Sequence, residues 1–336
     1  MKLLVVILNY NVTDLTLECL RSLSTRIEGV PGARVALVEN GSRPDAAERL
    51  RAAIDGNGWG SWVGLTLVHP NRGFTGGNNI AIRAALTWDD PPEYFLLLNA
   101  DTLVLDGALE ALVDLMDRTP RAGIAGSRLL DPQGLIQASP FRFQSIASEF
   151  DGGLRLGFVS RLLSRWQVVP PPPERAAAVE WVSGASMILR RQMLEEVGLL
   201  DEGLYTYFDD NDLCLRARRA GWETWFVPQS RIIHLEGAAT GIVRRVVKRR
   251  PPYWFQARRR YFLKNYGPLY TALADAAFIV GFSLWRVRRR LGRRSDPDPP
   301  HMLQDFIRNS VFCTGFRVTE VENPALREAA DGQPSA

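Results

Sequence analysis

The residues best suited to chemistry in this 336-residue chain follow the apolar run Tyr94–Leu98. Five large apolar residues in a row are typical of a buried central strand, and Asn99 and Asp101 come directly after them. Because side chains alternate along a strand, these two should point the same way. Amide and carboxylate oxygens at this spacing suit Mg²⁺ or Mn²⁺ shared with a phosphate group. Alternatively, Asp101 only caps the next helix.

A second group of carboxylates stands much later in the chain, at Asp209, Asp210 and Asp212. Aromatic residues precede this acidic run, and a helix is expected after it at Leu213–Ala220. Three carboxylates within four residues repel one another unless a cation or a substrate hydroxyl group relieves the repulsion. The run therefore indicates a site, although Asp212 alone could be a plain helix N-cap.

The elements that must position these residues alternate between strand and helix. That alternation predicts a mostly parallel α/β sheet with right-handed crossovers. Polar loops follow the strands and should converge on the carboxyl edge of the sheet, where open α/β sheets bind ligands. The expected strands of this half are Leu3–Leu8, Arg34–Val38, Leu65–Val68 and Tyr94–Leu98, with helices at Leu15–Leu23 and Ile80–Leu86.

The loop after the third strand contains three glycines, Gly73, Gly76 and Gly77. Glycines let the backbone approach a phosphate closely, and the next helix start offers free N–H groups to an anion. This loop and Glu39–Ser42 could also be ordinary turns or helix entries. A dinucleotide-binding Rossmann protein would have its glycines after the first strand, so that class is excluded.

The second half of the chain is less regular. Helices are expected at 108–117 and Arg191–Val197, and Pro170–Pro173 must be a stiff loop. A strand is expected at Val179–Leu189, where the small residues Gly184 and Ala185 would allow a close approach to the backbone. Further strands are expected at Ala122–Ala125, Arg128–Leu130, Trp225–Val227 and Arg231–His234. We expect one catalytic unit over residues 1–236, with a donor half at about 1–105 and an acceptor half at about 106–236.

Composition suggests a soluble protein with a basic attachment. Hydrophobic residues make up 46% and charged residues 23% of the chain, as in ordinary globular proteins. The three cysteines have no metal or disulfide spacing, and Leu3–Leu8 is too short for a signal peptide, so a cytoplasmic location is expected. Residues 237–294 hold fifteen Lys or Arg against the single acid Asp275, although the net charge of the chain is only +4.

The segment Leu269–Trp285 is apolar and lies among these arginines. Seventeen residues with an acid inside are marginal for a membrane span, so a helix lying on an anionic membrane surface is favoured. Contacts to substrate phosphates, or a solvated face, are the alternatives. No base-reading motif accompanies the basic patch, so nucleic acid is not expected. Residues 296–336 form a tail, disordered from about Asn323.

Taken in order, these motifs resemble those of the family 2 glycosyltransferases with a GT-A fold, particularly the bacterial rhamnosyltransferase-like members that build surface polysaccharides. The resemblance covers about residues 3–270, and its specificity comes from the ordered set rather than from any single piece. The matching stretches are Val5–Asn11, Val38–Ser42, Asn71–Phe74 with Gly76–Asn78, Leu97–Asp101, Val182–Ala185, Asp209–Arg216 and His234.

The resemblance implies an α/β GT-A fold with a Rossmann-like, mostly parallel sheet and a basic helical C-terminal extension at 237–295. It implies inverting transfer of a sugar, with rhamnose the leading candidate, from a dTDP- or UDP-linked donor to a glycan or polyprenyl-diphosphate-linked acceptor. The enzyme would work at the inner face of the cell membrane.

The resemblance also implies roles for individual residues. Asp101 and His234 would hold Mg²⁺ or Mn²⁺, and Asp210 would be the catalytic base, with Asp209 replacing the Glu of the family's Glu-Asp pair. Glu39 stands where Asp is commoner, and Asn99 stands for the first Asp of the DxD motif. The donor-binding residues would be Asn9, Asn11, Glu39, Asn71, Gly73, Phe74, Gly76, Asn78 and Asn99. The acceptor-binding residues would be Trp181, Gly184, Ala185 and Asp212, and Arg258, Arg259 or Lys264 could contact the diphosphate.

Two other classes compete with this interpretation. A sugar nucleotidyltransferase would need a glycine-rich loop with a basic residue after the first strand, where this chain has Asn9-Tyr10-Asn11. A non-catalytic glycan- or membrane-binding scaffold would not need Asp101 and Asp210.

Overall fold

The central strand of the sheet is β1 (Leu3–Asn9), which pairs in parallel with β2 (Arg34–Asn40) and β4 (Tyr94–Asn99). The computed structural model describes residues 1–235, 248–292 and 297–325. Residues Leu3–Ile7 and Tyr94–Leu98 are almost completely buried, as their continuous apolar sequences predicted.

Within the described residues the strands form one nine-stranded sheet, in the order β3-β2-β1-β4-β10-β6-β11-β5, with β8 on the outer side of β11. Six strands run in one direction, whereas β10, β5 and β8 run in the other, which confirms the mostly parallel sheet. The remaining strands are β3 (Val63–Val68), β5 (Thr102–Val104), β6 (Ala122–Leu130), β8 (Ala177–Val179), β10 (Ser186–Arg190) and β11 (Glu223–His234), and a separate pair is formed by β7 (Pro140–Phe141) and β9 (Trp181–Val182).

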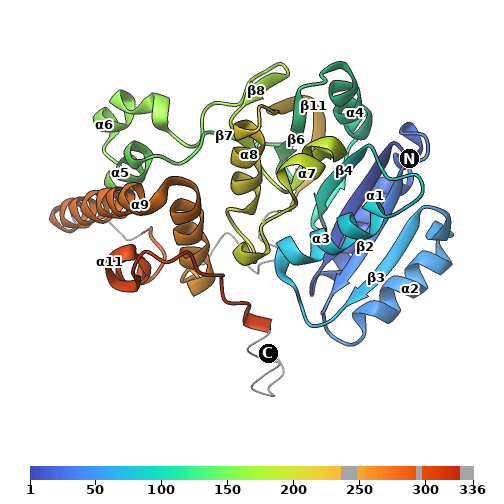
Figure 1. Ribbon diagram of the computed structural model, residues 1–336, viewed down its shortest axis with the longest axis horizontal. Helices are drawn as coiled ribbons and strands as arrows, with labels where there is room; N and C mark the ends of the chain where they lie inside the picture. The colour runs from blue at the N-terminus through green and yellow to red at the C-terminus, as the bar shows by residue number, and fades with distance from the viewer. Residues whose placement is uncertain (236–247, 293–296, 326–336) are drawn as a thin grey trace.

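Helices cover both faces of the sheet (Figure 1). One face packs against α1 (Thr13–Ser24), α2 (Ala46–Gly56) and α4 (Ala108–Arg118) through a cluster that includes Leu20 and Leu112. The opposite face packs against α3 (Gly73–Leu86), α7 (Arg191–Val197) and α8 (Asp209–Arg219). Short 3₁₀ turns lie at Ile27–Gly29, Trp59–Ser61, Ser164–Trp166 and Glu202–Leu204.

Two helices begin earlier than the sequence predicted. α3 starts at Gly73 and not at Ile80, and α8 starts at Asp209 and not at Leu213. The first turn of α8 therefore holds all three carboxylates, which the positive end of the helix dipole favours there. The two strands expected at Trp225–Val227 and Arg231–His234 are one strand, β11, with an irregularity between Val227 and Arg231.

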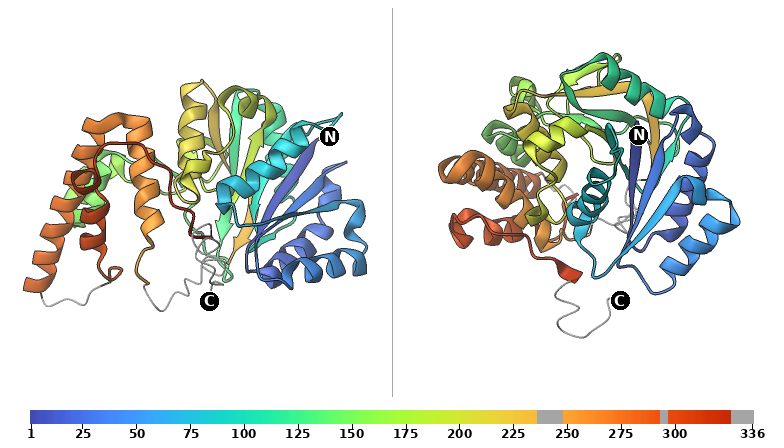
Figure 2. Two further views of the ribbon diagram at one scale, coloured as in Figure 1. Left: turned by 60° about the horizontal axis from the view of Figure 1, so that its bottom comes forward. Right: turned by 45° about the vertical axis from the view of Figure 1, so that its right-hand side comes forward.

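A helical layer stands beside this sandwich and includes α9 (Pro252–Leu291), α5 (Ile146–Leu154) and α6 (Gly157–Leu162). At Gly267 the backbone of α9 leaves the helical region, with φ at 81°, and Pro268 follows. The kink turns the second half of α9 back alongside the first (Figure 2). The sequence pattern did not predict α5 or α6, which lie in the weakly patterned stretch 121–175.

The described part of the C-terminal tail also has structure. It contains α10 (Met302–Asn309) and α11 (Val311–Thr314), which pack on α9. The chain then returns to the sandwich, where Val321 N donates to Gly203 O at 2.7 Å and Asn323 Nδ2 donates to Asn71 O at 2.8 Å. The expected disorder from Asn323 is therefore wrong at Asn323 itself, and residues 326–336 lie outside the described residues.

The division of the chain at residue 236 stays a prediction, because residues 236–247 lie outside the described residues. The first half of α9 is nevertheless tied to the sandwich. Tyr261 and Phe262 pack against Leu215 of α8, and Arg260 binds Asp201 at 2.8 Å. These contacts mean that α9 helps to position α8.

Candidate functional site

A cavity of about 540 Å³ opens at the carboxyl ends of β1, β2 and β4, the edge at which the sequence predicted a site. The loop before α8 and the start of α9 close its other side. The lining residues from the sandwich are Leu8, Tyr10, Val12, Asn40, Asn71, Gly73, Phe74, Asn99, Ala100, Asp101, Ser183, Gly184 and Ala185, and those from the other side are Tyr205, Thr206, Tyr207, Asp209, Asp210 and Tyr253.

Asn99 and Asp101 line the cavity, and His234 lies next to both of them. The antiparallel pairing of β5 with β11 sets His234 opposite Thr102, and this places His234 Nε2 3.4 Å from Asp101 Oδ1 and 3.4 Å from Asn99 Nδ2. Asp101 is 3% exposed, and no hydrogen-bond donor among the described residues reaches its Oδ1. A buried carboxylate oxygen without a donor is costly, so this group of residues is suited to receive a ligand.

The same cavity is also lined by the acidic pair Asp209 and Asp210. Asp210 Oδ2 accepts a hydrogen bond from Gly184 N at 3.1 Å, and its Oδ1 accepts one from Asn211 N at 2.8 Å. Burial raises the pKa of Asp210, and it raises the pKa of Asp209 further because the Asp210 carboxylate is next to it. The backbone donors at Gly184 and Asn211 oppose this rise at Asp210, because they stabilise its ionised form.

Several predicted residues position the loops around the cavity and do not line it. Asn9 is fully buried, where its Oδ1 accepts from Thr16 Oγ1 at 2.8 Å and its Nδ2 donates to Ser42 Oγ at 3.2 Å. Glu39 accepts from the same Ser42 hydroxyl at 2.9 Å. Asn11 accepts from Arg43 N at 3.1 Å and borders a neighbouring hollow of about 430 Å³.

Of the three glycines after β3, Gly73 lines the cavity, whereas Gly76 and Gly77 lie within α3 and do not reach it. A role in phosphate binding therefore stays a prediction for Gly73. Gly76, Gly77 and Asn78 lie in the first two turns of α3 and are buried. A Cβ on Gly77 would lie 2.4 Å from Leu8 Cδ1, so this glycine allows the helix to approach the sheet. Asn78 Nδ2 donates to Phe74 O within the helix at 2.8 Å. The residues of this stretch that reach the cavity are Asn71, Gly73 and Phe74.

Trp181 was predicted to bind the acceptor, but it packs away from the cavity. It is 9% exposed, stacks on Phe141 at a centroid distance of 4.1 Å and donates from Nε1 to Arg142 O at 2.9 Å. Arg258 does not reach the cavity either, because it is buried between Glu149, at 2.7 Å, and Asp275, at 2.5 Å. Arg259 donates to Thr319 Oγ1 at 3.1 Å.

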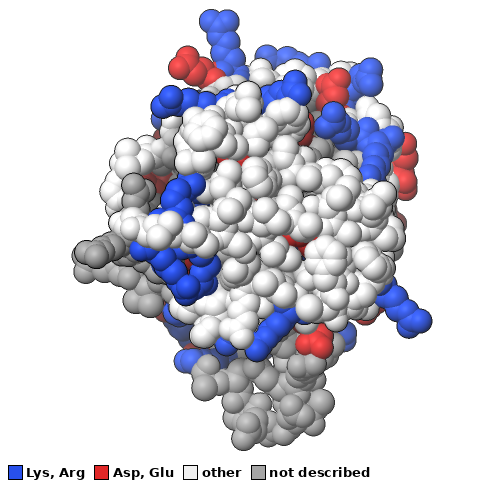
Figure 3. Space-filling view, turned by 90° about the vertical axis from the view of Figure 1, so that its left-hand side faces the viewer, with Lys and Arg blue, Asp and Glu red and all other residues white. Residues whose placement is uncertain are grey.

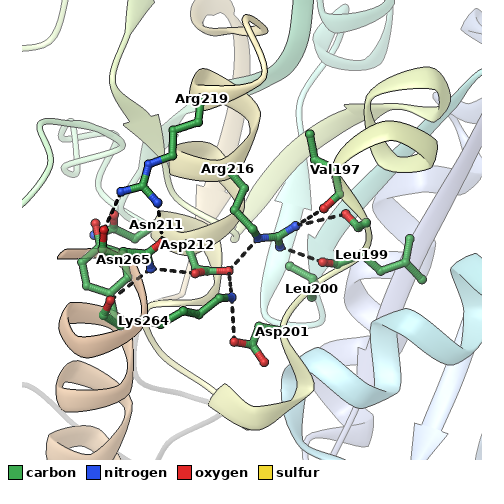
Figure 4. A network of polar contacts seen from close by, with 12 residues as sticks. Val197, Leu199, Leu200, Asp201, Asn211, Asp212, Arg216, Arg219, Lys264 and Asn265 are labelled. Carbon is green, nitrogen blue, oxygen red and sulfur yellow. Dashed lines mark hydrogen bonds and ion pairs between the residues drawn. The ribbon is translucent and has the colours of Figure 1, made fainter. Parts of the chain in front are cut away.

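Asp212 is the other predicted acceptor residue that the structure places elsewhere. Its side chain is completely buried, and Oδ2 binds Arg216 Nε and Lys264 Nζ, each at 2.9 Å. Oδ1 accepts from Asn265 Nδ2 at 2.9 Å. Lys264 also binds Asp201 at 2.8 Å, so α9 is fixed to α8 and to the loop before it through one polar network (Figure 4). Asp212 is therefore a structural residue, and the ammonium group of Lys264 is bound to Asp212 and Asp201.

We expect Asp212→Ala to lower the free energy of unfolding by about 3–5 kcal/mol, because Arg216 and Lys264 would lose a buried counter-charge. Asp114→Ala is the matched control. It also removes the acid of an i,i+4 pair with arginine, but Asp114 and Arg118 are 65% and 77% exposed, so a change below about 0.5 kcal/mol is expected. Denaturant unfolding of both variants measures the difference, and equal midpoints would show that the network contributes nothing.

Two groups of lining residues were missed by sequence reasoning. Asn40 lies next to the predicted Glu39, and its Nδ2 donates to Asn71 Oδ1 at 2.9 Å and to Gly73 O at 3.1 Å. The others are tyrosines: Tyr207 lies parallel to Tyr253 at a centroid distance of 6.0 Å, and Tyr205 contacts Tyr253 edge-on at 5.7 Å. The aromatic residues before the acidic run were a visible signal, but no pattern in the sequence links them to Tyr253.

Comparison with known proteins agrees with this geometry. The family model "Glycosyltransferase like family 2" matches residues 2–267, which end at the kink in α9. The N-acetylglucosaminyl-diphospho-decaprenol L-rhamnosyltransferase of Mycobacterium tuberculosis is 30% identical over 226 residues, which cover 62% of this chain and 68% of the relative. Rhamnosyltransferase WbbL of Escherichia coli is 25% identical over 48% of this chain and 60% of its own length.

A solved structure shares the fold. The crystal structure of GalNAc-T7 with UDP, GalNAc and Mn²⁺ superposes with a TM-score of 0.57 at 15% identity, and the match covers 95% of this chain and 58% of that one. The sheet order, the helical layers and the family match converge on one conclusion. The chain belongs to the family 2 glycosyltransferases, with a GT-A fold and rhamnosyltransferase-like relatives, and it is a hexosyltransferase.

Proposed function

We propose that this enzyme transfers a sugar, with inversion, from a dTDP- or UDP-linked donor to a lipid-linked glycan acceptor, with Asp210 as the general base and a divalent cation at Asp101. The single observation that carries the proposal is that one cavity is lined by both Asp101, which has His234 beside it, and the acidic pair Asp209 and Asp210. Inverting transfer needs these two functions on opposite sides of the anomeric carbon, one for the leaving diphosphate and one for the attacking hydroxyl.

Asp101, His234 and Asn99 fit a Mg²⁺ or Mn²⁺ site that is completed by substrate. Within the described residues no three His, Cys, Asp or Glu side chains surround a common point, so the protein alone does not make a closed cage. Mg²⁺ is commonly held by one or two carboxylates together with substrate phosphates, and the Asp101 oxygen without a donor is a suitable ligand. When bound, the cation would neutralise the charge that develops on the leaving diphosphate.

Asp210 would remove the proton of the acceptor hydroxyl group. The Gly184 amide holds Oδ2 in the cavity at 3.1 Å, and the raised pKa brings this carboxylate closer to the working pH of a general base. The acceptor oxygen would form its bond to the anomeric carbon as the bond to the diphosphate breaks, and the proton would pass to Asp210. Asn71, Gly73 and Phe74 would bind the donor and Gly184 and Ala185 the acceptor, and all five residues line the cavity.

The acceptor and the location follow from the relatives. The Mycobacterium tuberculosis protein is named for a decaprenol-diphosphate acceptor and for rhamnose, and we propose a polyprenyl-diphosphate-linked acceptor and rhamnose for this chain. Such an acceptor lies in the membrane, so the enzyme would work at the inner surface of the cell membrane. A non-catalytic scaffold is less well supported, because it would have no use for the carboxylates of Asp101, Asp209 and Asp210 in one cavity.

The melting temperature of the purified protein with dTDP, UDP or GDP, each with Mn²⁺ or with a chelator, tests the proposal. A ligand at 100 times its dissociation constant adds about 2.7 kcal/mol of stability, which corresponds to a rise of several degrees. We expect a rise with dTDP or UDP that the chelator removes. A rise with Mn²⁺ alone sets the baseline, and the absence of any nucleotide effect would contradict the proposed donor site.

A further inference from the structure

The second half of α9 exposes apolar side chains along one side. Leu269, Leu273, Val280, Leu284, Val287 and Leu291 are between 49% and 81% exposed. Their separations of four, seven, four, three and four residues place them in one stripe along a helix, and we call these six residues the apolar stripe. It extends for about 33 Å at 1.5 Å per residue.

The opposite side of the same helical segment is packed against protein. Phe282 and Trp285 are buried with Phe255 and Phe306. A Cβ on Gly281 would lie 2.6 Å from Phe150 O of α5, so the two helices are in close contact. The described part of the chain therefore packs on the side of this segment opposite to the apolar stripe and leaves the stripe itself exposed.

Asp275 favours a position of this segment beside the protein over a span across a bilayer. Its carboxylate is 1% exposed, with Oδ1 on Arg258 at 2.5 Å and Oδ2 accepting from Val311 N at 2.9 Å. α9 is long and apolar enough to cross a membrane by length and composition. Insertion would nevertheless break this buried ion pair, at a high cost for two unpaired charges.

The apolar stripe has apolar neighbours and a basic surround. Arg288 donates to Leu154 O at 2.9 Å and to Arg155 O at 2.7 Å, which holds the end of α5 beside α9, and α6 follows two residues later. Phe158 and Leu162 of α6 are 68% and 77% exposed. Figure 3 shows this side of the molecule, where uncharged side chains fill the middle and Lys and Arg gather mainly toward the edge.

We propose that the apolar stripe, together with Phe158 and Leu162, docks on a lipid bilayer that contains anionic lipid. Exposed apolar surface of this extent on a soluble chain is typical of an interaction site. The occupant of this surface is either a second copy of the chain or a lipid bilayer, and the exposed residues Arg161, Arg165 and Arg290 favour the bilayer. In a contact between two copies these arginines would repel one another, whereas anionic headgroups would attract them. Apolar side chains would enter the acyl boundary and the arginines would stay at headgroup level.

Docking in this way would hold the cavity near the membrane surface. Arg258 pairs with Asp275 and Phe255 packs with Phe282, so the two halves of α9 are antiparallel. The Leu291 end therefore returns to the end of α9 at which Tyr253 lines the cavity. Docking would bring the cavity close to a lipid-linked acceptor, and this benefit rests on the proposed function. The docking proposal itself does not depend on that function.

Sedimentation with vesicles tests the docking proposal without any turnover. The full chain should bind vesicles of phosphatidylglycerol and phosphatidylcholine, and binding should weaken with salt and with phosphatidylcholine alone. Val280→Glu with Leu284→Glu places two charges in the apolar stripe, where each residue is 51% exposed. We expect at least a tenfold loss of vesicle affinity, because charged side chains resist entry into the acyl boundary.

The matched control is Leu67→Glu with Leu135→Glu, at 47% and 67% exposure on the sandwich, and it should bind vesicles like the unmodified protein. The nucleotide-dependent rise in melting temperature should be the same in all three proteins, so that failure of docking and failure of the donor site can be told apart. Unchanged vesicle binding by the stripe variant would overturn the proposal. So would a concentration-dependent dimer in solution that the stripe variant abolishes while vesicle binding persists.

Discussion

Asp210→Asn should lower kcat by about 10²–10⁴-fold, the usual contribution of a positioned general base, and leave nucleotide binding intact. Asparagine keeps the volume of the side chain and can still accept from Gly184 N, but it cannot take up a proton. The measurements are the turnover rate with a lipid-linked acceptor and the nucleotide-dependent rise in melting temperature. An Asp210→Asn enzyme with the full rate would show that another group is the base.

Asp209→Asn is the matched control, because it changes the adjacent carboxyl group in the same turn of α8. Burial and the neighbouring Asp210 raise the pKa of Asp209, so the variant resembles the protonated form and should lose much less activity. The pH dependence provides a second readout. The pKa of Asp210 is raised, and the base works only when deprotonated, so the rate should fall on acidification at a higher pH than for an ordinary aspartate. Asp210→Asn should lack that fall.

Asp101→Ala should impair both donor binding and turnover. The proposed cation would lose its carboxylate ligand, and charge stabilisation by a metal contributes several kcal/mol, or about 10²–10³-fold in rate. We expect the Mn²⁺-dependent rise in melting temperature with nucleotide to disappear along with the activity. His234→Ala tests the same site more mildly, since His234 lies 3.4 Å from Asp101.

A structural explanation of the Asp101→Ala effect makes a different prediction. If Asp101 served only the fold, its removal would lower the melting temperature of the free protein and leave the added effect of nucleotide and Mn²⁺ unchanged. Because Asp101 Oδ1 is buried without a hydrogen bond and has only His234 near it, at 3.4 Å, removing this carboxylate should instead change the stability of the free protein little. These two outcomes are distinguished in one set of melting curves.

The C-terminal helices contribute more to the site than a separate extension would. Lys264 and Asn265 hold Asp212, which lies two residues after the proposed base. Tyr253 lines the cavity from the start of α9. The apolar stripe is in the second half of α9, whereas Lys264 and Asn265, which fix α8, are in the first half. Substitutions in the apolar stripe therefore leave the network around Asp212 intact.

The sequence by itself determined the central strands and the edge at which they open. Continuous apolar runs such as Tyr94–Leu98 are local signals of buried parallel strands, and the polar residues after them must lie at the carboxyl edge. Asp101 was found in this way, the acidic run that contains Asp210 was a separate local signal, and the family resemblance contributed Asn71 and Gly184. All four line the cavity. The family resemblance contributed the pairing of His234 with Asp101, which no local pattern contains.

The tertiary structure decided which polar residues face the cavity and which serve the fold. Asp212 and Asp210 share one helical turn, but Asp212 faces Arg216 and Lys264 whereas Asp210 faces Gly184. From the sequence, Gly77 resembles a phosphate-binding glycine. In the structure it lies so close to Leu8 that a Cβ would clash there, which indicates a packing role. These assignments depend on packing between elements distant in the chain, such as α8 with α9, and periodicity within a single element carries no information about that packing.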